Sequence, residues 1–321
     1  MSEDLVLFGP TSHVDIHVDP KPAHVADDDP ELQQVVDWFR KRPGLQQHFG
    51  SILRQSIDEV LDGQRTGRYD IALAEKTEKT YLGTKVEIVT RAAFDLPRGA
   101  NMDYAIAGHD VDSKFSLRGA WSIPTEAMGH MCLLSSANDR KGLFDVGLIR
   151  ITPEVLNKGL NKDQKTTITA AARDRVVWLA QRAPLPENLL LTLPDTLVRT
   201  IVAAGSGQKR INQLLRSVQG RIIERNTAVT VARQADGLKR CRDARPQLAR
   251  EGIVILGHQN QSPMVARALG LPVPMKGTFL SVRLTPVNTP APDRPTVTLP
   301  EGTYAVAQPN DPITPVPTIR Y

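Results

Sequence analysis

The sequence has few cysteines, no long apolar run and no secretory signal, and each absence excludes a class of protein. Its 321 residues include two cysteines, Cys132 and Cys241, which stand alone without CxxC spacing. The sequence therefore suggests neither a zinc site nor a disulfide framework. No uninterrupted apolar run is long enough to span a bilayer, and the acidic N-terminus, residues 1–4, is unlike a secretory signal. We expect a cytoplasmic protein.

The length and the proline pattern predict two domains of an α/β protein. A chain of 321 residues can form two domains that each bury a core. A short segment with two prolines, residues 181–188, is typical of a linker. We expect an N-terminal arm over residues 1–28 that is mobile. The predicted domains are then residues 29–180, with helices, a strand-rich centre and a helix around Val176, and residues 189–321.

A β-hairpin is predicted in the strand-rich centre. Residues 102–107 and 110–115 favour strands, and Gly108 and His109 between them favour a two-residue turn. Further strands are predicted at residues 131–134 and 146–149. Helices that flank such a mixed sheet would give an α/β sandwich.

The predicted register of this hairpin places acids and a lysine on one face. It sets Ala105 opposite Asp112 and Asp103 opposite Lys114, and side chains alternate between the two faces of a strand. A slip of one residue would move Asp103 to the other face. The charged face therefore depends on the register.

Three acids and a lysine are the groups that a metal-dependent phosphodiesterase needs. We expect Asp103 and Asp112 to be the principal ligands of Mg²⁺, with Glu87 and the Ser113 carbonyl completing the shell. Lys114 would stabilise the attacking hydroxide and the charge of the transition state. One metal ion or two is left open by the sequence.

Simpler interpretations exist for each of these residues. Glu87 follows Thr84 by three positions in a predicted helix over residues 83–94, which is also the pattern of a helix capping box. The hairpin acids and lysine would alternatively form a solvated charged face, since D-x-K triplets are common.

A second motif resembles that of an enzyme class, but its essential nucleophile is missing in this chain. Val60, Asp62 and Gly63 resemble the K-x-D-G nucleotidyl-transfer motif of DNA ligases, with valine in place of the nucleophilic lysine. Valine has no amine to form a phosphoamide, so ligase activity is not expected.

Basic residues concentrate after the predicted linker. An amphipathic helix from Ser206, a helix over residues 228–235, an Asp236-Gly237 turn and a basic helix from Leu238 predict a helix-turn-helix, with residues 253–256 and 279–283 as a wing. A solvated basic surface is the alternative. The candidate DNA-binding residues, with one from the loop near residue 65, are Arg65, Lys209, Arg210, Arg233, Lys239, Arg240, Arg242 and Arg245.

The acid and lysine motif belongs to a longer resemblance. Glu87, Asp103 and residues 112–114 resemble the PD-(D/E)xK nuclease core, with Met102 where proline is usual. Longer strings resemble the NaeI-type restriction endonucleases over nearly the whole chain, from about residue 44 to about residue 283. These strings are residues 61–69, 76–80, 83–88, 207–212 and 218–223.

The resemblance implies a specific set of properties. It implies a catalytic role for Glu87, Asp103, Asp112 and Lys114, the Mg²⁺-dependent hydrolysis of DNA to 5′-phosphate products, and a C-terminal domain similar to catabolite activator protein. It also implies a type IIE homodimer that binds two copies of a GC-rich palindrome similar to GCCGGC, the second copy activating cleavage. Two alternatives stay open: a DNA-binding regulator with an inactive nuclease core, and a monomeric nicking or repair nuclease.

Overall fold

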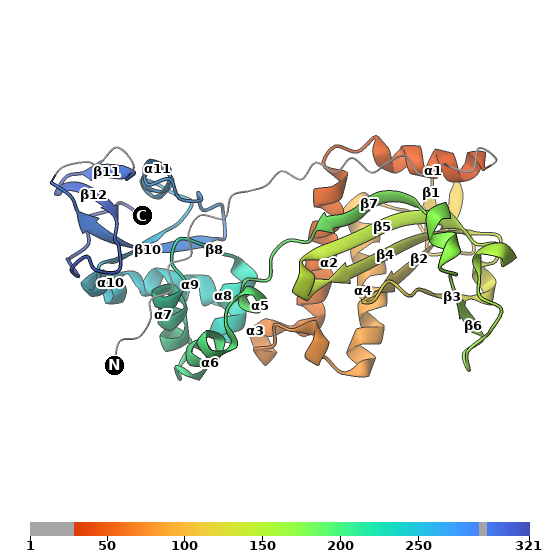
Figure 1. Ribbon diagram of the computed structural model, residues 1–321, viewed down its shortest axis with the longest axis horizontal. Helices are drawn as coiled ribbons and strands as arrows, with labels where there is room; N and C mark the ends of the chain where they lie inside the picture. The colour runs from red at the N-terminus through yellow and green to blue at the C-terminus, as the bar shows by residue number, and fades with distance from the viewer. Residues whose placement is uncertain (1–28, 289–293) are drawn as a thin grey trace. The chain divides into compact units, whose positions relative to one another are not determined.

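The structure, a computed structural model, describes residues 29–288 and 294–321 and divides them into two compact units. The first unit contains the described residues up to Leu61 and the range Asp70–Asn188, and the second contains Asp62–Tyr69 and Leu189–Tyr321 (Figure 1). The arm predicted over residues 1–28 lies outside the described residues. No helix in the described ranges combines the length and apolar character needed to cross a membrane.

The first unit is built on a five-stranded mixed sheet. The strand order is β1-β2-β4-β5-β7, in which β2 and β4 run parallel and the other neighbours are antiparallel. The strands are β1 (Tyr104–Ile106), β2 (His109–Ser116), β4 (Met131–Asn138), β5 (Leu143–Arg150) and β7 (Val177–Pro184). The predicted strands at residues 131–134 and 146–149 are therefore confirmed within β4 and β5.

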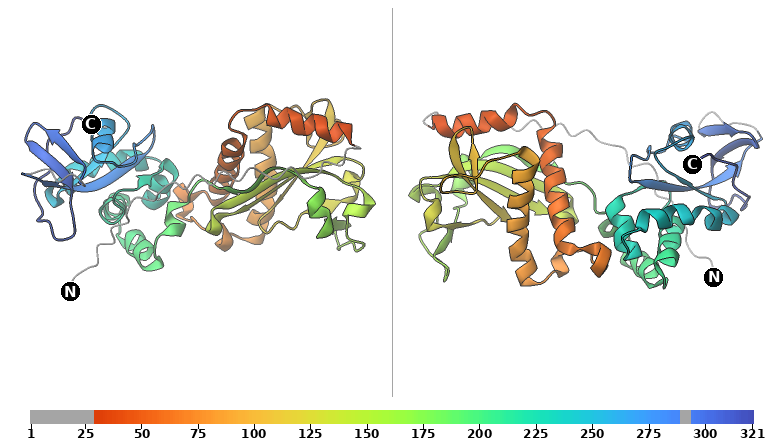
Figure 2. Two further views of the ribbon diagram at one scale, coloured as in Figure 1. Left: turned by 45° about the horizontal axis from the view of Figure 1, so that its top comes forward. Right: turned by 180° about the vertical axis from the view of Figure 1, so that it is seen from behind.

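Long helices cover one face of this sheet. Figure 2 shows α2 and α4 crossing in front of the strands when the molecule is viewed from behind. Buried side chains of α1, α2 and α4 share one core with Tyr104, Val111 and Leu133 of the sheet. The helices are α1 (Pro30–Arg40), α2 (Leu45–Leu61) and α4 (Lys76–Phe94).

Irregular segments cover the opposite face. Trp121, Leu134 and Ile149 belong to a second core on that side, where the small sheet of β3 and β6 also lies. Side chains that alternate along β4 thus enter two different cores, as expected for a strand with both faces covered. The elements are β3 (Ser122–Pro124), β6 (Lys165–Thr167) and the 3-10 helices η1 (Ile71–Leu73), η2 (Thr125–Ala127), η3 (Asp139–Lys141), η4 (Pro153–Val155) and η5 (Ala171–Arg175).

Helix α4 begins earlier than the sequence predicts. Its capping box joins Glu75 and Glu78, where the Glu78 carboxylate accepts the Glu75 backbone N–H at 2.8 Å. Thr84 and Glu87 lie inside the helix, so the capping-box interpretation of Glu87 is wrong. The predicted start at Gly83 is wrong: α4 begins at Lys76 and continues through Gly83, because glycine raises the free energy of a helix only modestly.

The hairpin of β1 and β2 has a register different from the predicted one. Ala107 and Gly108 form the turn, with positive φ angles of 52° and 88°, and Asp110 rather than Asp112 lies opposite Ala105. The turn needs a positive φ at both central residues, which places Gly108 second and moves His109 into the strand. The register thus differs by two residues. Because the side-chain period is also two, the two faces keep their predicted residues.

The segment before the predicted linker is a strand and not a helix. Val177 begins β7, which continues to Pro184, so half of residues 181–188 belongs to the sheet. Val177 and Leu179 enter the helix-covered core while Val176 and Trp178 contact the other, which is strand alternation. Pairing with β5 places this segment in the sheet, so the helix predicted around Val176 is wrong.

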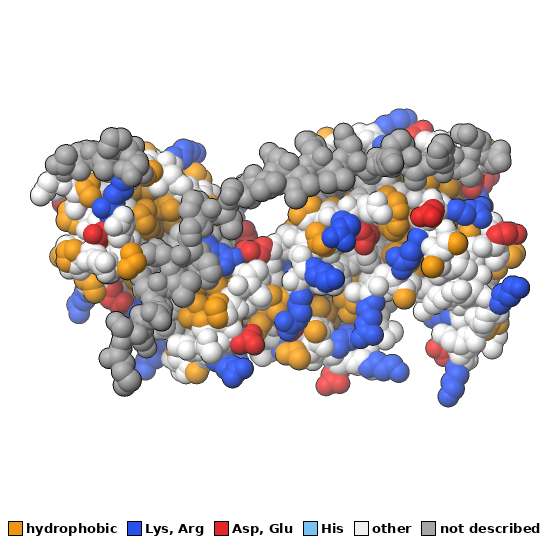
Figure 3. Space-filling model, in the orientation of Figure 1, with side chains coloured by type: hydrophobic (Ala, Val, Ile, Leu, Met, Phe, Trp, Pro, Cys, Tyr) orange, Lys and Arg blue, Asp and Glu red, His pale blue; other side chains and the backbone are white. Residues whose placement is uncertain are grey.

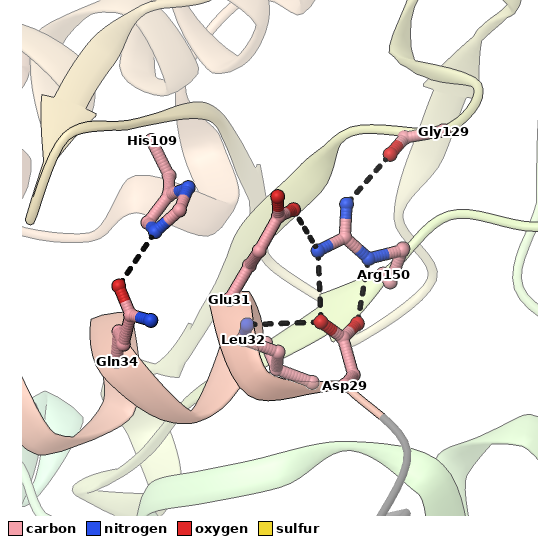
Figure 4. A network of polar contacts seen from close by, with 7 residues as sticks. All are labelled: Asp29, Glu31, Leu32, Gln34, His109, Gly129 and Arg150. Atoms are coloured by element: carbon pink, nitrogen blue, oxygen red, sulfur yellow. Dashed lines mark hydrogen bonds and ion pairs between the residues drawn. The ribbon is translucent and has the colours of Figure 1, made fainter.

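An arginine joins the start of α1 to the end of β5. Arg150 Nε and Nη2 contact Asp29 at 2.6 and 2.9 Å, and Nη2 also contacts Glu31 at 2.8 Å (Figure 4). Asp29 caps α1 by accepting the Leu32 N–H at 3.0 Å. The Arg150 guanidinium lowers the pKa of the Asp29 carboxyl below its usual value.

This ion pair should make the stability of the first unit depend on pH. A carboxyl with a lowered pKa contributes stability that is present above its unfolded pKa of about 4 and is lost as the pH falls through its folded pKa. We expect Asp29→Asn to lower the melting temperature by a few degrees at pH 7, with the difference from the parent protein shrinking progressively as the pH falls below about 4. Thermal melts across this range measure it, and a difference that stays constant with pH would contradict the prediction.

The second unit packs helices against a β-sheet. Strand β10 pairs with β12, β8 and β9, all antiparallel, and β12 pairs with β11. The strands are β8 (Ile222–Ile223), β9 (Ile253–Leu256), β10 (Phe279–Pro286), β11 (Thr296–Leu299) and β12 (Gly302–Val306). The helices are α3 (Gly63–Thr66), α5 (Leu189–Thr192), α6 (Asp195–Ala203), α7 (Gly207–Ser217), α8 (Arg225–Ala232), α9 (Gly237–Asp243), α10 (Arg245–Leu248), α11 (Ser262–Ala268) and η6 (Ala249–Glu251).

The first helix of the pair, α8, differs from its predicted bounds at both ends. Helix α8 begins at Arg225 and ends at Ala232, because Arg233 adopts a left-handed conformation with φ 52°. Helix α9 begins one residue before the predicted Leu238 and ends at Asp243, and Pro246 lies in the first turn of α10. Proline has no N–H to donate, which the first turn does not require. The order of helix, short turn and basic helix is nevertheless present.

The close approach of these helices requires a glycine. A Cβ on Gly237 would lie 2.8 Å from both the Ala228 carbonyl oxygen and the Val229 Cα, and both atoms are backbone. We expect Gly237→Ala to destabilise the second unit by about 1–3 kcal/mol, as overpacking does. Urea unfolding followed by far-UV circular dichroism measures the change.

Gly83→Ala is the matched control for this substitution. Gly83 lies inside α4, and its Cβ would meet no atom within 4 Å. The control should stabilise the first unit by roughly 0.5–1 kcal/mol through helix propensity. Equal effects of the two alanines would refute the steric argument.

Candidate active site

Two acids and a lysine meet on one face of the hairpin. Asp112 and Lys114 alternate along β2, and the Lys114 Nζ contacts Asp112 Oδ2 at 2.5 Å. Asp103 precedes β1, and its Oδ2 accepts the Ser113 backbone N–H at 2.8 Å. The Asp112 side chain is 8% exposed and that of Lys114 is 21% exposed, so solvent screens this ion pair weakly.

The two carboxyls influence each other. Burial raises the pKa of the Asp103 carboxyl above its usual value, and the adjacent Asp112 carboxyl raises it further. The Ser113 N–H and the Lys114 ammonium offset part of this rise. Two neighbouring acids that repel each other are a group that a bound cation would stabilise.

A cysteine that the sequence analysis set aside lies behind this pair. Cys132 is opposite Asp112 in the parallel pairing of β2 with β4, and its thiol donates to Asp112 Oδ2 at 3.6 Å. Burial raises the pKa of this thiol well above its usual value, which keeps the donor protonated. Only the pairing of the two strands brings Cys132 to Asp112, so the sequence carried no signal for it.

Glu87 lies apart from the acid pair. Its carboxylate is bound by Arg91, four residues along α4, and Arg91 Nη2 also donates to the Asp103 carbonyl at 3.4 Å. The buried Tyr104 hydroxyl donates to the Glu87 carbonyl at 3.0 Å and joins α4 to β1. The sequence analysis missed Arg91, although its spacing of four residues from Glu87 is the usual signal for such a pair.

The acid pair, Asp103 and Asp112, has the chemistry to bind a hard divalent cation. Glu87 does not lie with these two carboxylates. Asp103, Asp112 and the Ser113 carbonyl supply the oxygen donors that Mg²⁺ prefers. The Ser113 carbonyl currently accepts the Lys114 ammonium at 3.2 Å. Among the residues described, no three or more His, Cys, Asp and Glu side chains are gathered closely enough to hold a metal. The predicted meeting of all three acids is therefore not found in this conformation.

The ligase-like motif falls where the chain passes between the units. Val60 is buried in the core of the first unit, at the last turn of α2. Asp62 and Gly63 belong to the second unit, as does the rest of the segment Asp62–Tyr69, which the division drawn from sequence assigned to the first domain. A Cβ on Gly63 would lie 2.2 Å from Thr230 Oγ1, so the glycine permits this segment to pack on α8.

The candidate DNA-binding residues of the second unit fall into two groups. Arg210 donates to the Val231 and Ala232 carbonyls at the end of α8, and Arg245 donates to the Ile255 carbonyl and stacks on Tyr321. Arg240 pairs with Asp236 at 3.0 Å. Arg210 and Arg245 thus bind carbonyl groups of other elements, whereas Arg240 forms a partly exposed ion pair at the start of its own helix. The exposed residues of the set are Arg65, Lys209, Arg233, Lys239 and Arg242.

Positive side chains also gather on the first unit. Figure 3 shows lysine and arginine side chains spread over the face of that unit on which β4 and β5 are drawn in Figure 1. Such a face attracts a polyanion.

A mixed sheet flanked by helices, with two acids and a lysine on its edge hairpin, is typical of restriction-endonuclease-like nucleases. The family model described as Restriction endonuclease NaeI matches residues 33–315. The type II restriction enzyme NaeI of Lentzea aerocolonigenes is 40% identical to this chain over 309 residues, which are 93% of this chain and 97% of that protein. The chain belongs to the NaeI family of restriction endonucleases, and it is an enzyme of the type II restriction endonuclease class.

Proposed function

We propose that this enzyme makes Mg²⁺-dependent double-strand cuts at a short GC-rich palindrome similar to GCCGGC, leaving 5′-phosphate ends. The observation that carries the proposal is that Asp103 lies beside Asp112 on one hairpin face and that Asp112 forms an ion pair with Lys114. Family membership supports the reaction class. We place the activity in the cytoplasm.

The catalytic roles follow from the positions of these groups. Asp103 and Asp112 would hold Mg²⁺, which when bound supplies Lewis acidity and an activated water. The Lys114 ammonium lies 2.5 Å from Asp112 and can stabilise negative charge on a phosphate oxygen beside it. The Cys132 thiol donates to Asp112 Oδ2 and limits the rotation of that carboxylate.

The second unit would bind a further copy of the DNA site and activate cleavage. The helices α8 and α9 with the strands β9 and β10 have the element order of a winged helix. The exposed basic residues of this unit would contact phosphates and make the affinity sensitive to salt. A homodimer would cut both strands of a palindrome, because each protomer supplies one catalytic site.

Plasmid digestion tests this proposal. Supercoiled plasmid carrying GCCGGC is incubated with the full chain and Mg²⁺, with and without a short duplex of the same sequence. We expect discrete linear fragments, faster in the presence of the added duplex. Sequencing of the fragment ends then gives the recognition sequence and the cut position.

The other outcomes separate the alternatives. Open circles would indicate a nicking enzyme, and DNA that is bound but uncut would indicate a regulator. Cleavage at an unrelated sequence would refute the GC-rich target while keeping the chemistry. No response to the added duplex would refute activation by a second site.

A further inference from the structure

Arg91 is the charged residue beside the site for which the proposed reaction has no role. One of its nitrogens, Nη2, contacts both the Glu87 carboxylate and the carbonyl of Asp103. Its Nε is buried and has no hydrogen-bond partner among the described residues. The guanidinium can therefore donate a further hydrogen bond. It lies between Glu87 on α4 and Asp103, the residue directly before β1.

We propose that Arg91 is a positioning residue that withholds Glu87 from the Asp103–Asp112 pair until DNA is bound, which makes cation binding depend on DNA. The inference rests on the proposed function for the identity of the anion that releases Glu87. The side chains of Glu87 and Arg91 are 24% and 21% exposed, so the pair is partly shielded from water and screened less than a surface ion pair.

A DNA phosphate is a suitable competitor for this arginine. The guanidinium group matches the geometry of a phosphate and forms two parallel hydrogen bonds with it. A phosphate that enters beside Asp103 and Lys114 would offer Arg91 an alternative anion and provide a partner for its Nε. Glu87 would then lose its ionic partner, and a divalent cation held by the acid pair would offer its carboxylate an alternative positive charge.

Arg91→Gln provides the first test, with Ca²⁺ as the probe and calorimetry as the readout. Ca²⁺ is, like Mg²⁺, a hard cation that prefers oxygen ligands. We expect the DNA-free Arg91→Gln protein to bind Ca²⁺ about tenfold more tightly than the parent protein, the size of a typical coupling between sites. Addition of a duplex carrying GCCGGC should tighten Ca²⁺ binding by about the same factor in the parent protein, with little further gain in the variant. Gel analysis confirms that the duplex stays intact.

The removal of a positive charge would by itself favour a cation, so two controls are needed. Lys85→Gln removes a positive charge from the same helix, where Lys85 pairs with Glu59 at 2.9 Å, and should leave the Ca²⁺ affinity unchanged. The double variant Arg91→Gln/Glu87→Gln should return to the affinity of the parent protein, because the gain is supplied by Glu87. If the Ca²⁺ affinity of the double variant stays above that of the parent protein, the gain comes only from the lost charge repulsion between Arg91 and the cation. That result would overturn the proposal.

Glu87→Gln tests the same idea without altering Arg91, should Arg91→Gln fail to fold. The proposal predicts no change in DNA-free Ca²⁺ affinity and a weaker affinity with DNA present. A loss of affinity without DNA would show that Glu87 already binds the cation, which contradicts the proposal. These measurements require no cleavage, so a shift in Ca²⁺ affinity would support the role of Arg91 even if the plasmid remained uncut. Absence of Ca²⁺ binding in every protein would overturn the metal site and this inference together.

Discussion

Asp112→Asn should reduce the rate of DNA cleavage by on the order of 10³-fold, the usual effect of removing a group that stabilises transition-state charge. The asparagine keeps the shape of the side chain and its contact with Cys132, but it removes the negative charge that faces Lys114. It also removes one of the two anionic ligands in the proposed cation site. Single-turnover cleavage of a GCCGGC plasmid at saturating enzyme measures the effect on chemistry apart from binding.

Asp110→Asn is the matched control, two residues earlier on the same strand and the same face. Its carboxylate accepts the backbone N–H groups of Ala100 and Asn101 at 2.7 and 2.8 Å and so fixes a loop. The amide oxygen of an asparagine can keep one of these two contacts, and we expect the cleavage rate to stay within a few-fold of the parent rate. Equal loss in both variants would mean that the hairpin face as a whole, and not Asp112, is required.

Arg54→Met should destabilise the first unit by about 3–5 kcal/mol, the typical cost of removing one partner of a buried ion pair. Arg54 on α2 contacts Asp139 at 2.5 Å and Asp58 at 2.6 Å, and the Asp139 side chain is only 2% exposed. Methionine would fill the space but leave Asp139 buried without its guanidinium partner. Asn188 also donates to Asp139, at 3.2 Å, but a neutral amide does not replace the lost charge.

Tryptophan fluorescence can follow this change in the full chain. The three tryptophans, Trp38, Trp121 and Trp178, all lie in the first unit, so urea unfolding by fluorescence reports on that unit. Lys85→Met breaks a more exposed pair in the same unit and should change its stability by no more than about 1 kcal/mol. Similar effects of the two methionines would show that burial of the Arg54 pair does not matter.

The hairpin shows what alternation along a strand can determine. The residues that share a face, Asp103, Asp112 and Lys114, were predictable because side chains alternate with a period of two. The turn was placed one residue too late, and the opposed pairs were therefore wrong. The error did not alter the charged face, since the register moved by an even number of residues. A predicted site is thus more robust than the predicted pairing that supports it.

Local pattern failed where tertiary contact decided the outcome. The helix predicted around Val176 is wrong, because pairing with β5 makes residues 177–184 a strand. The segment Asp62–Tyr69 continues the sequence of α2 but packs in the second unit, which no composition change marks. In both cases the segment is stabilised by contacts with residues that are distant in the sequence. A short stretch of sequence does not contain those residues, so its pattern alone does not predict the outcome.

The sequence by itself determined the reaction class, the three residues of the hairpin site and the basic character of the C-terminal half. These follow from residue identity, short-range periodicity and long strings that resemble the family. Only the tertiary structure decided that Glu87 pairs with Arg91 apart from the acid pair, that Cys132 lies behind Asp112, and that Arg210 and Arg245 bind the protein's own carbonyl groups. The physical reason is that a charged side chain binds the partner that packing brings nearest, and packing joins strands and helices that are far apart in the chain.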